Sequence, residues 1–189
     1  MKKRILVAVV LAVLLTASAH AQNFIELVKN GAPQDVQDAI SKGAAVNGLD
    51  HDGLTPLGEA ARYNQNPEVI TILLKAGANV KDQTKDGWTP LMYAAENNQN
   101  PEVITILLKA GANLEARDKD DETPLMHAVR LNRNPDMITT LLKAGADVKA
   151  QTKDGWTPLM LATRYCQQPG MITALLKAGA DVKAQTKDG

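Results

Sequence analysis

The chain has 189 residues, of which 44% are hydrophobic and 22% charged, and its 21 basic residues balance its 21 acidic residues. This composition is typical of one soluble domain of ordinary size and does not itself indicate a function. Nucleic-acid binding needs a positive face, and no basic run follows Arg4, so we expect no nucleic-acid partner.

The first 21 residues predict a secretory signal peptide. A basic start at residues 2–4 precedes an apolar run over residues 5–15 and a small-x-small cleavage pattern at residues 19–21. Because this run is shorter than the roughly 20 residues that span a bilayer core, we expect cleavage before Gln22 and no membrane partner afterwards; a retained anchor is the alternative. The remaining chain carries 18 basic and 21 acidic residues, a net charge of −3. We expect export to a bacterial periplasm or, alternatively, secretion.

Beyond this segment the chain repeats with a period of 34 residues. Thr-Pro-Leu begins at positions 55, 89, 123 and 157, and Gly-Ala begins at positions 43, 77, 111, 145 and 179. Two landmarks with one period predict an array of similar units. The predicted units are a capping unit at 22–51, four repeats at 52–85, 86–119, 120–153 and 154–187, and the start of a truncated further repeat at 188–189.

The capping unit lacks Thr-Pro-Leu but keeps two helix-like apolar patterns, around Phe24 and around Val36. We expect it to shield the first end of a stack. In the repeat 86–119, Gly87 marks a tight turn, and Thr89 caps a helix whose first residue is proline and which ends near residue 97 or 98. Asn100, again followed by proline, then caps a second helix, which Gly111 ends.

This unit of turn, Thr-Pro-Leu helix, second helix and Gly-Ala exit resembles the ankyrin repeat over nearly all of the chain beyond the signal segment. The resemblance implies an all-α fold, an ankyrin-repeat solenoid of stacked helix-turn-helix units with β-turn or hairpin fingers. Tetratricopeptide units share the 34-residue length, but they place proline at the end of the second helix. One departure concerns the residue after Thr-Pro-Leu, which is histidine in the family and here is Gly58, Met92, Met126 or Met160. We expect the histidine's hydrogen bond to be lost and the turns to be looser.

The resemblance also implies a binding function, carried by a concave face of turn tips and first helices. We expect a non-enzymatic, exported protein-protein interaction module with a protein partner; a secreted effector or immunity-type protein that uses the same surface is the alternative. The predicted contact residues are Leu54, Arg62, Tyr63, Lys85, Asp86, Trp88, Glu122, Arg130, Lys153, Trp156, Arg164 and Tyr165. The wider set of variable positions adds Leu49, His51, Asp52, Gln83, Glu96, Asn97, Arg117, Lys119, Asp120, Leu131, Gln151 and Asp154.

Trp88 and Trp156 are the strongest of these candidates, because Leu54 and Glu122 show that the repeat does not need an aromatic ring at this position. Trp, Tyr and Arg are the residue types enriched at binding hot spots. The alternative is that each tryptophan ring lies along its own turn.

Catalytic, cofactor and metal sites are not expected. Cys166 is the only cysteine, and a nucleophilic role would need a positioned base that the sequence does not show; an enzyme using Cys166 is nevertheless the alternative of another class. His51 and His127 have no second histidine or cysteine at ligand spacing. We expect a monomer unless an uncapped C-terminal repeat self-associates.

Overall fold

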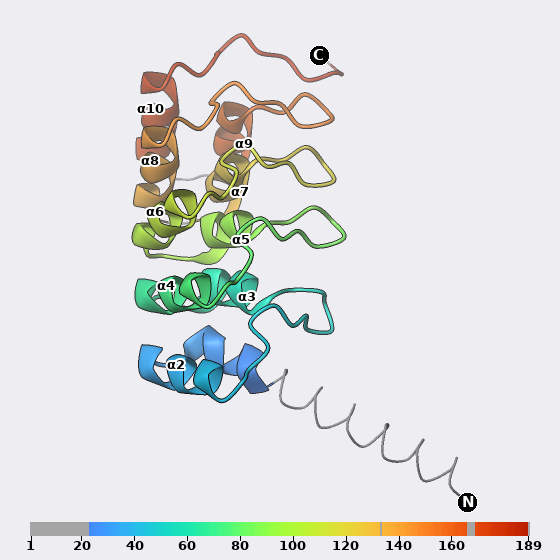
Figure 1. The fold of residues 1–189 in the computed structure, drawn as a ribbon. Coiled ribbons are helices and arrows are strands. Elements are labelled where there is room, and N and C mark those ends of the chain that lie inside the picture. Colours follow the sequence, from blue (N-terminus) through green and yellow to red (C-terminus); the bar gives the residue numbers. More distant parts are fainter. Residues whose placement is uncertain (1–22, 133, 166–168, 189) are drawn as a thin grey trace, which may run out of the picture.

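Paired helices stack along one axis in the computed structural model, which describes residues 23–132, 134–165 and 169–188 (Figure 1). The predicted signal segment 1–21 and Cys166 lie outside the described residues. Residues 23–30 form a first helix. It is followed by α2 (Pro33–Ser41), α3 (Pro56–Tyr63), α4 (Pro67–Lys75), α5 (Pro90–Asn97), α6 (Pro101–Lys109), α7 (Pro124–Leu131), α8 (Pro135–Lys143), α9 (Pro158–Tyr165) and α10 (Pro169–Lys177). Each predicted unit from 22 to 187 contains one helix pair, and the predicted all-α solenoid is confirmed.

The helices form two columns. The first helices of the pairs, α3, α5, α7 and α9, pack on one another in order, and α2, α4, α6, α8 and α10 form the second column. Between successive pairs the chain leaves the stack as a narrow loop, and these loops all project on the same side, beyond the first column (Figure 1). We call these loops the fingers, and we call the face that they form with the first column the finger face.

The helix boundaries follow from local capping. Thr89 accepts a hydrogen bond from the Met92 N–H at the start of α5, and Asn100 accepts from the Glu102 N–H at the start of α6. Both helices have proline in their first turn, where a missing N–H is no loss. α6 ends before Gly111, whose φ of 93° lies in the left-handed region that glycine tolerates best. The predicted starts and stops are therefore confirmed for this repeat.

Each finger is closed by a backbone hydrogen bond across a tight turn. Thr84 N–H donates to the Trp88 carbonyl (3.0 Å), and Asp118 N–H donates to that of Glu122 (3.2 Å). Neighbouring fingers are also joined, since Lys119 N–H donates to the Asp86 carbonyl (2.8 Å). From the second finger onward, the fingers therefore form a hydrogen-bonded row along the stack.

Methionine substitutes for the expected histidine in fastening the turn to its helix. The Met92 Sδ accepts a hydrogen bond from the Thr89 N–H (3.4 Å), and the Met126 Sδ accepts from the Thr123 N–H (3.5 Å). Each threonine side chain in turn accepts from the methionine N–H, so threonine and methionine satisfy each other at the helix N-terminus, as in a capping box. Sulfur is a weak acceptor, but the expected loss of this bond was wrong for the methionine repeats.

A row of buried asparagines ties α3, α5 and α7 each to the repeat before it. The Asn98 side chain donates to the carbonyls of Ala61 and Asn64 (both 2.9 Å) and accepts from the Asn100 N–H (2.9 Å). Asn64 and Asn132 make the corresponding three bonds one repeat earlier and later. The asparagines thus satisfy main-chain groups at helix ends that stacking would otherwise bury unpaired.

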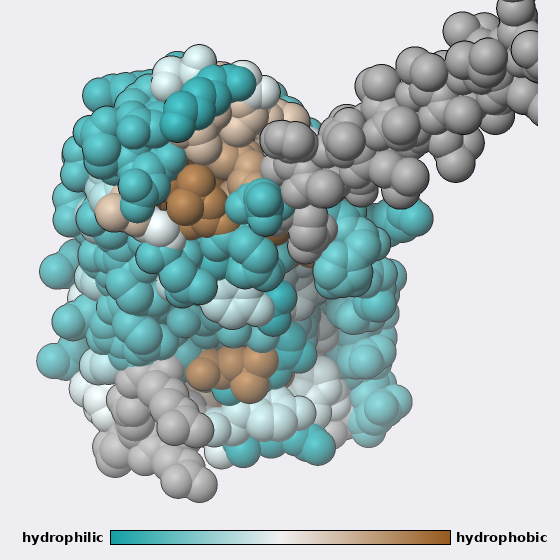
Figure 2. All heavy atoms as spheres, turned by 90° about the horizontal axis from the view of Figure 1, so that it is seen from below, coloured by the Kyte–Doolittle hydropathy of each residue, from teal (hydrophilic) through white to brown (hydrophobic). Residues whose placement is uncertain are grey.

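The core is one continuous stack of aliphatic side chains between the columns, including fully buried Leu57, Leu91, Ile104 and Ile138. Figure 2 views the stack from the end formed by the first helix pair. Hydrophilic residues cover most of this face, and hydrophobic ones appear only as separate patches. A polar outer surface is what an end unit of a solenoid needs.

Candidate partner-binding surface

The finger face carries exposed apolar side chains at one repeated position. Tyr63, Leu131 and Tyr165 occupy the last residue of α3, α7 and α9 and are 43%, 55% and 49% exposed. The fourth member of this series, Asn97 at the end of α5, is half-buried. An ordinary surface scatters such residues singly, whereas here the stack repeats them along one face.

Arginines lie beside two of these rings. The Arg62 guanidinium carbon is 5.0 Å from the centre of the Tyr63 ring and 5.6 Å from that of Tyr93. At the other end of the face, the Arg164 guanidinium carbon is 5.4 Å from the Tyr165 ring centre. These distances are typical of cation–π interactions. The predicted contact residues therefore form arginine–tyrosine pairs whose tyrosines are partly exposed.

The two predicted tryptophan anchors differ in their surroundings. Trp88 is half-buried, and its ring centre lies 4.9 Å from that of Tyr93 and 4.1 Å from that of His127 in the next repeat. Trp156 is also half-buried, with the Arg164 guanidinium carbon 5.2 Å above its ring. Trp88 is neither a freely exposed contact residue nor a ring that lies only along its own turn, because its ring packs across the junction between two repeats.

The other predicted contact residues divide into finger tips and buried groups. Lys85, Asp86 and Lys153 are exposed on the fingers. Asp86 Oδ1 pairs with Lys119 Nζ (3.2 Å), and Lys153 Nζ donates to the Lys119 carbonyl. Leu54, in contrast, is only 7% exposed and lines a cavity between the first two fingers.

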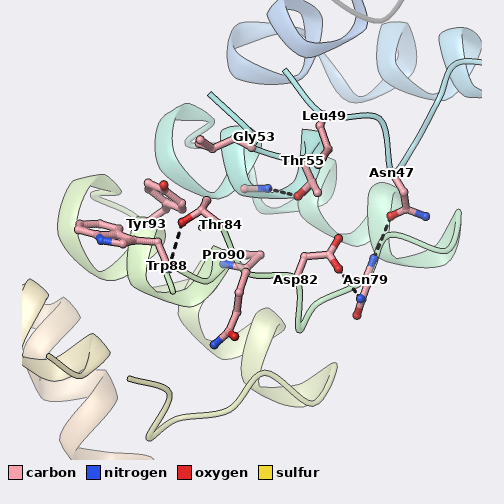
Figure 3. Close-up of a pocket in the computed structure, with 13 residues that line it drawn as sticks. Asn47, Leu49, Gly53, Thr55, Asn79, Asp82, Thr84, Trp88, Pro90 and Tyr93 are labelled. Carbon is pink, nitrogen blue, oxygen red and sulfur yellow. Dashed lines mark hydrogen bonds between the residues drawn. The ribbon is translucent and has the colours of Figure 1, made fainter. Parts of the chain in front are cut away.

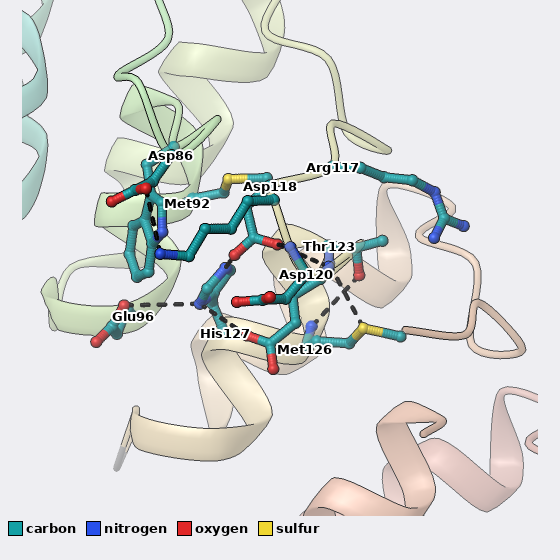
Figure 4. Close-up of polar contacts among 12 residues, drawn as sticks. Asp86, Met92, Glu96, Arg117, Asp118, Asp120, Thr123, Met126 and His127 are labelled. Atoms are coloured by element: carbon teal, nitrogen blue, oxygen red, sulfur yellow. Dashed lines mark hydrogen bonds and ion pairs between the residues drawn. The ribbon is translucent and has the colours of Figure 1, made fainter. Parts of the chain in front are cut away.

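Glu122 and the half-buried Arg130 contact His127, the centre of a polar cluster that includes Asp118 (Figure 4). His127 is fully buried on α7, and its Nε2 lies 3.1 Å from Asp118 Oδ2. An Arg130 terminal nitrogen lies 3.3 Å from His127 Nδ1 and 2.8 Å from Glu122 Oε2. Because arginine can only donate, Nδ1 accepts from Arg130 when the ring is neutral, and the proton that faces Asp118 is then on Nε2.

Charges in this cluster shift the carboxyl groups in opposite directions. Burial opposes ionisation of Asp118, but hydrogen bonds from His127 and from the Glu122 and Asp120 N–H groups outweigh it and hold its pKa below the usual value. Burial raises the pKa of Glu122, and the neighbouring His127 and Arg130 offset only part of that effect. Glu96 adds a third carboxylate, with Oε2 buried and 3.7 Å from His127 Nδ1.

Carboxylates lie beside both histidines that the sequence analysis judged isolated. Ligand atoms of Asp118, Glu122 and His127 fall within 4.8 Å of one another, a spacing at which a metal ion is sterically possible. The Arg130 guanidinium, however, bridges His127 and Glu122. The cluster therefore acts chemically as a hydrogen-bonded ion-pair network. Asp50, His51 and Asp52 form a similar group in the first finger, where Asp50 Oδ1 accepts from the N–H groups of Asp52 and Leu54.

The finger-to-helix contact at Asp118 and His127 has counterparts in two other repeats. The same two positions hold Thr84 and Tyr93 one repeat earlier, and Asp50 and Glu59 two repeats earlier. Burial, the hydrogen bond with Asp50 and the negative charge of Asp50 together raise the pKa of Glu59 to about 7, against the opposing charge of Lys29. These two positions therefore hold a different pair of polar side chains in each of the three repeats.

A cavity of about 460 Å³ opens on the finger face between the first two fingers (Figure 3). Its walls include Leu54, Thr55, Gly58, Trp88 and Tyr93. This cavity was not predicted from the sequence, although Gly58, at a position held elsewhere by methionine, was the signal.

None of the helices in the described part of the chain is both long and apolar enough to cross a bilayer. A family model described as ankyrin repeats in three copies matches residues 24–118 and 100–186. No curated protein matches the chain significantly. The two matched ranges together span nearly all of the chain after the predicted signal segment.

Proposed function

Because the chain belongs to the ankyrin-repeat family, whose repeats are generally protein-protein interaction modules, we propose that its finger face binds a protein partner without catalysing a reaction. The observation that supports this is the repeated exposure of Tyr63, Leu131 and Tyr165 on one face. Large rings and aliphatic side chains beside arginine supply the contact area from which binding hot spots are made.

The stacked helices also favour a preformed surface. Each finger is closed by its own backbone bond, and from the second finger onward each is also bonded to the next finger, so binding does not have to order flexible loops. Ordering costs about 0.5–1.5 kcal/mol for each immobilised side chain, and a rigid surface avoids part of that cost. Arg62 and Arg164 extend the surface at its two ends.

The test compares two surfaces of the same protein. The partner is captured by cross-linking from the exported fraction of the source cells, purified, and its Kd measured for the wild type and for a Tyr63→Ser/Leu131→Ser/Tyr165→Ser variant. We expect at least ten-fold weaker binding by this variant. Leu176→Ser is the control, because Leu176 is exposed by 43% on α10 in the other column. Equal affinities for the triple variant and the wild type, or a loss confined to Leu176→Ser, would contradict the proposal.

We further propose that the protein acts outside the cytoplasm, on the basis of the basic, apolar and small-x-small pattern in residues 1–21. N-terminal sequencing of the protein from the exported fraction should then begin at Gln22. A sequence that begins at Met1 would contradict export with cleavage.

A further inference from the structure

We propose that the cavity between the first two fingers is a socket for a methionine side chain of the protein partner. The inference rests on the proposed function, since it names what one part of the finger face recognises. The cavity lies beside the α3 N-terminus, with Thr55 on one side and Trp88, Pro90 and Tyr93 on the other (Figure 3), and Gly58 also lines it.

The stack itself shows what fits at this place. Position 58 corresponds to Met92, Met126 and Met160 in the following repeats, and the side chains of Met92 and Met126 are fully buried. At Gly58 the space is open: a Cβ there would have Thr55 Oγ1 at 3.6 Å and Tyr93 Cδ2 at 4.0 Å, which are ordinary contacts. The first repeat therefore has the methionine site without the methionine.

The missing side chain also leaves a hydrogen-bond donor without its acceptor. In the later repeats, the threonine N–H at this position donates to the methionine Sδ (3.4–3.5 Å). Thr55 is only 6% exposed, and among the described residues its N–H has no hydrogen-bond acceptor. A buried N–H without an acceptor is unfavourable, so a thioether from a partner gains a hydrogen bond as well as apolar contacts.

The charge at the rim of the cavity favours a basic neighbour for that methionine. Among the described residues that line the cavity, Asp82 is the only charged one, and the others at the rim are neutral groups such as Asn47, Asn79 and Gln83. Asp82 is half-buried, and its one side-chain hydrogen bond is donated by Asn79. A partner segment with Lys next to Met complements this rim, whereas Glu next to Met is repelled.

The first experiment uses dipeptides as probes and needs no identified partner. We would titrate ¹⁵N-labelled protein with N-acetyl-Met-Lys-amide and follow the amide signals of Thr55 and Gly58 and the indole signal of Trp88. We expect saturable shifts with a Kd in the millimolar range, as befits a small fragment. The near-isosteric N-acetyl-Gln-Lys-amide should bind at least five-fold more weakly, and N-acetyl-Met-Glu-amide at least two-fold more weakly.

The decisive variant is Gly58→Met, which gives the first repeat the residue found in the other three. We expect it to fold with a raised Tm, because its thioether fills the cavity and accepts from Thr55 N–H, and to abolish the probe-induced shifts. Gly170→Met is the matched control, because Gly170 is exposed on α10 and a Cβ there meets no atom within 4 Å. This control should bind the probe as the wild type does.

Three results would overturn the socket: no saturable shift with the methionine probe, equal binding of the glutamine probe, or unchanged shifts in Gly58→Met. With the purified partner, we expect Gly58→Met to weaken binding at least ten-fold. Unchanged partner affinity in Gly58→Met would overturn the assignment of the socket to the partner, while a loss in the Tyr63→Ser/Leu131→Ser/Tyr165→Ser variant would still support the finger face.

Discussion

The Asn98 side chain donates a hydrogen bond to the carbonyl of Asn64, the residue at the same position one repeat earlier, at 2.9 Å. Asn132 continues the row by donating to Asn98 (2.7 Å). Such a row couples the ends of α3, α5 and α7 to their neighbours, so stability in this stack depends on contacts between repeats as well as within them.

Asn98→Ala should lower the free energy of unfolding by about 2–4 kcal/mol, because it removes two buried hydrogen bonds and one part-buried hydrogen bond and leaves their main-chain partners unpaired. Urea unfolding followed by circular dichroism would measure this loss. The adjacent Asn97→Ala is a matched control, because Asn97 is half-buried and its Oδ1 makes no hydrogen bond. Equal losses in the two variants would show that the asparagine row does not stabilise the stack.

Local sequence was sufficient to predict the helix ends, because their causes lie within a few residues. Thr89 with Pro90, and Asn100 with Pro101, carry their capping signals in the chain itself. The contact of Trp88 with His127 could not be predicted in this way, since it depends on how one repeat stacks on the next. The repeat pattern places a residue on a face of the stack, but it does not show which side chain of the next repeat that residue contacts.

The buried cluster was missed for a related reason. Asp118 and His127 are nine residues apart, and only the return of the finger onto α7 brings them to 3.1 Å. Aligning the repeats by position offered a signal, because Asp50, Thr84 and Asp118 fall at one position while Glu59, Tyr93 and His127 fall at another. Polar pairs that change together across repeats are a sign of contact, although the sequence does not show their protonation.

Glu59 should make the protein less stable as pH rises. Its pKa is about 7 in the folded protein, against 4.5 for an ordinary glutamate, so the folded state holds a proton that the unfolded state releases between these values. The free energy of unfolding should therefore fall as pH rises from about 4.5 to 7, by up to about 3 kcal/mol. Glu59→Gln keeps a donor for Asp50 and carries no charge, so it should be more stable than the wild type at pH 8 and similar at pH 4. Urea unfolding across this range would reveal the difference, and parallel curves for the two proteins would rule out this role of Glu59.

Asp118 should have the opposite effect at low pH. Because its folded pKa lies below the usual value, its contribution to stability is present above the unfolded pKa of about 3.9 and is lost as pH falls through the folded pKa. Asp118→Asn should be less stable than the wild type at pH 6, by about 1–3 kcal/mol, and the gap should narrow towards pH 2. Acid unfolding of both proteins would measure this convergence. A gap that stays constant with pH would mean that the loss comes from packing and not from the carboxylate charge.

Asp121 places a non-glycine residue where the other fingers have glycine. Its φ is 61°, and the equivalent residues Gly53, Gly87 and Gly155 have φ values of 82–86°. A side chain in this left-handed region is strained, whereas glycine adopts it freely. Relief of this strain favours Asp121→Gly, whereas the greater freedom of glycine in the unfolded chain opposes it. We expect a net rise in the free energy of unfolding of about 0.5–1 kcal/mol. Asp120→Gly is the control, since Asp120 does not have a positive φ, and it should be neutral or destabilising. If chemical denaturation shows that Asp121→Gly is the less stable of the two, then the aspartate at this turn supplies an interaction that outweighs its backbone strain.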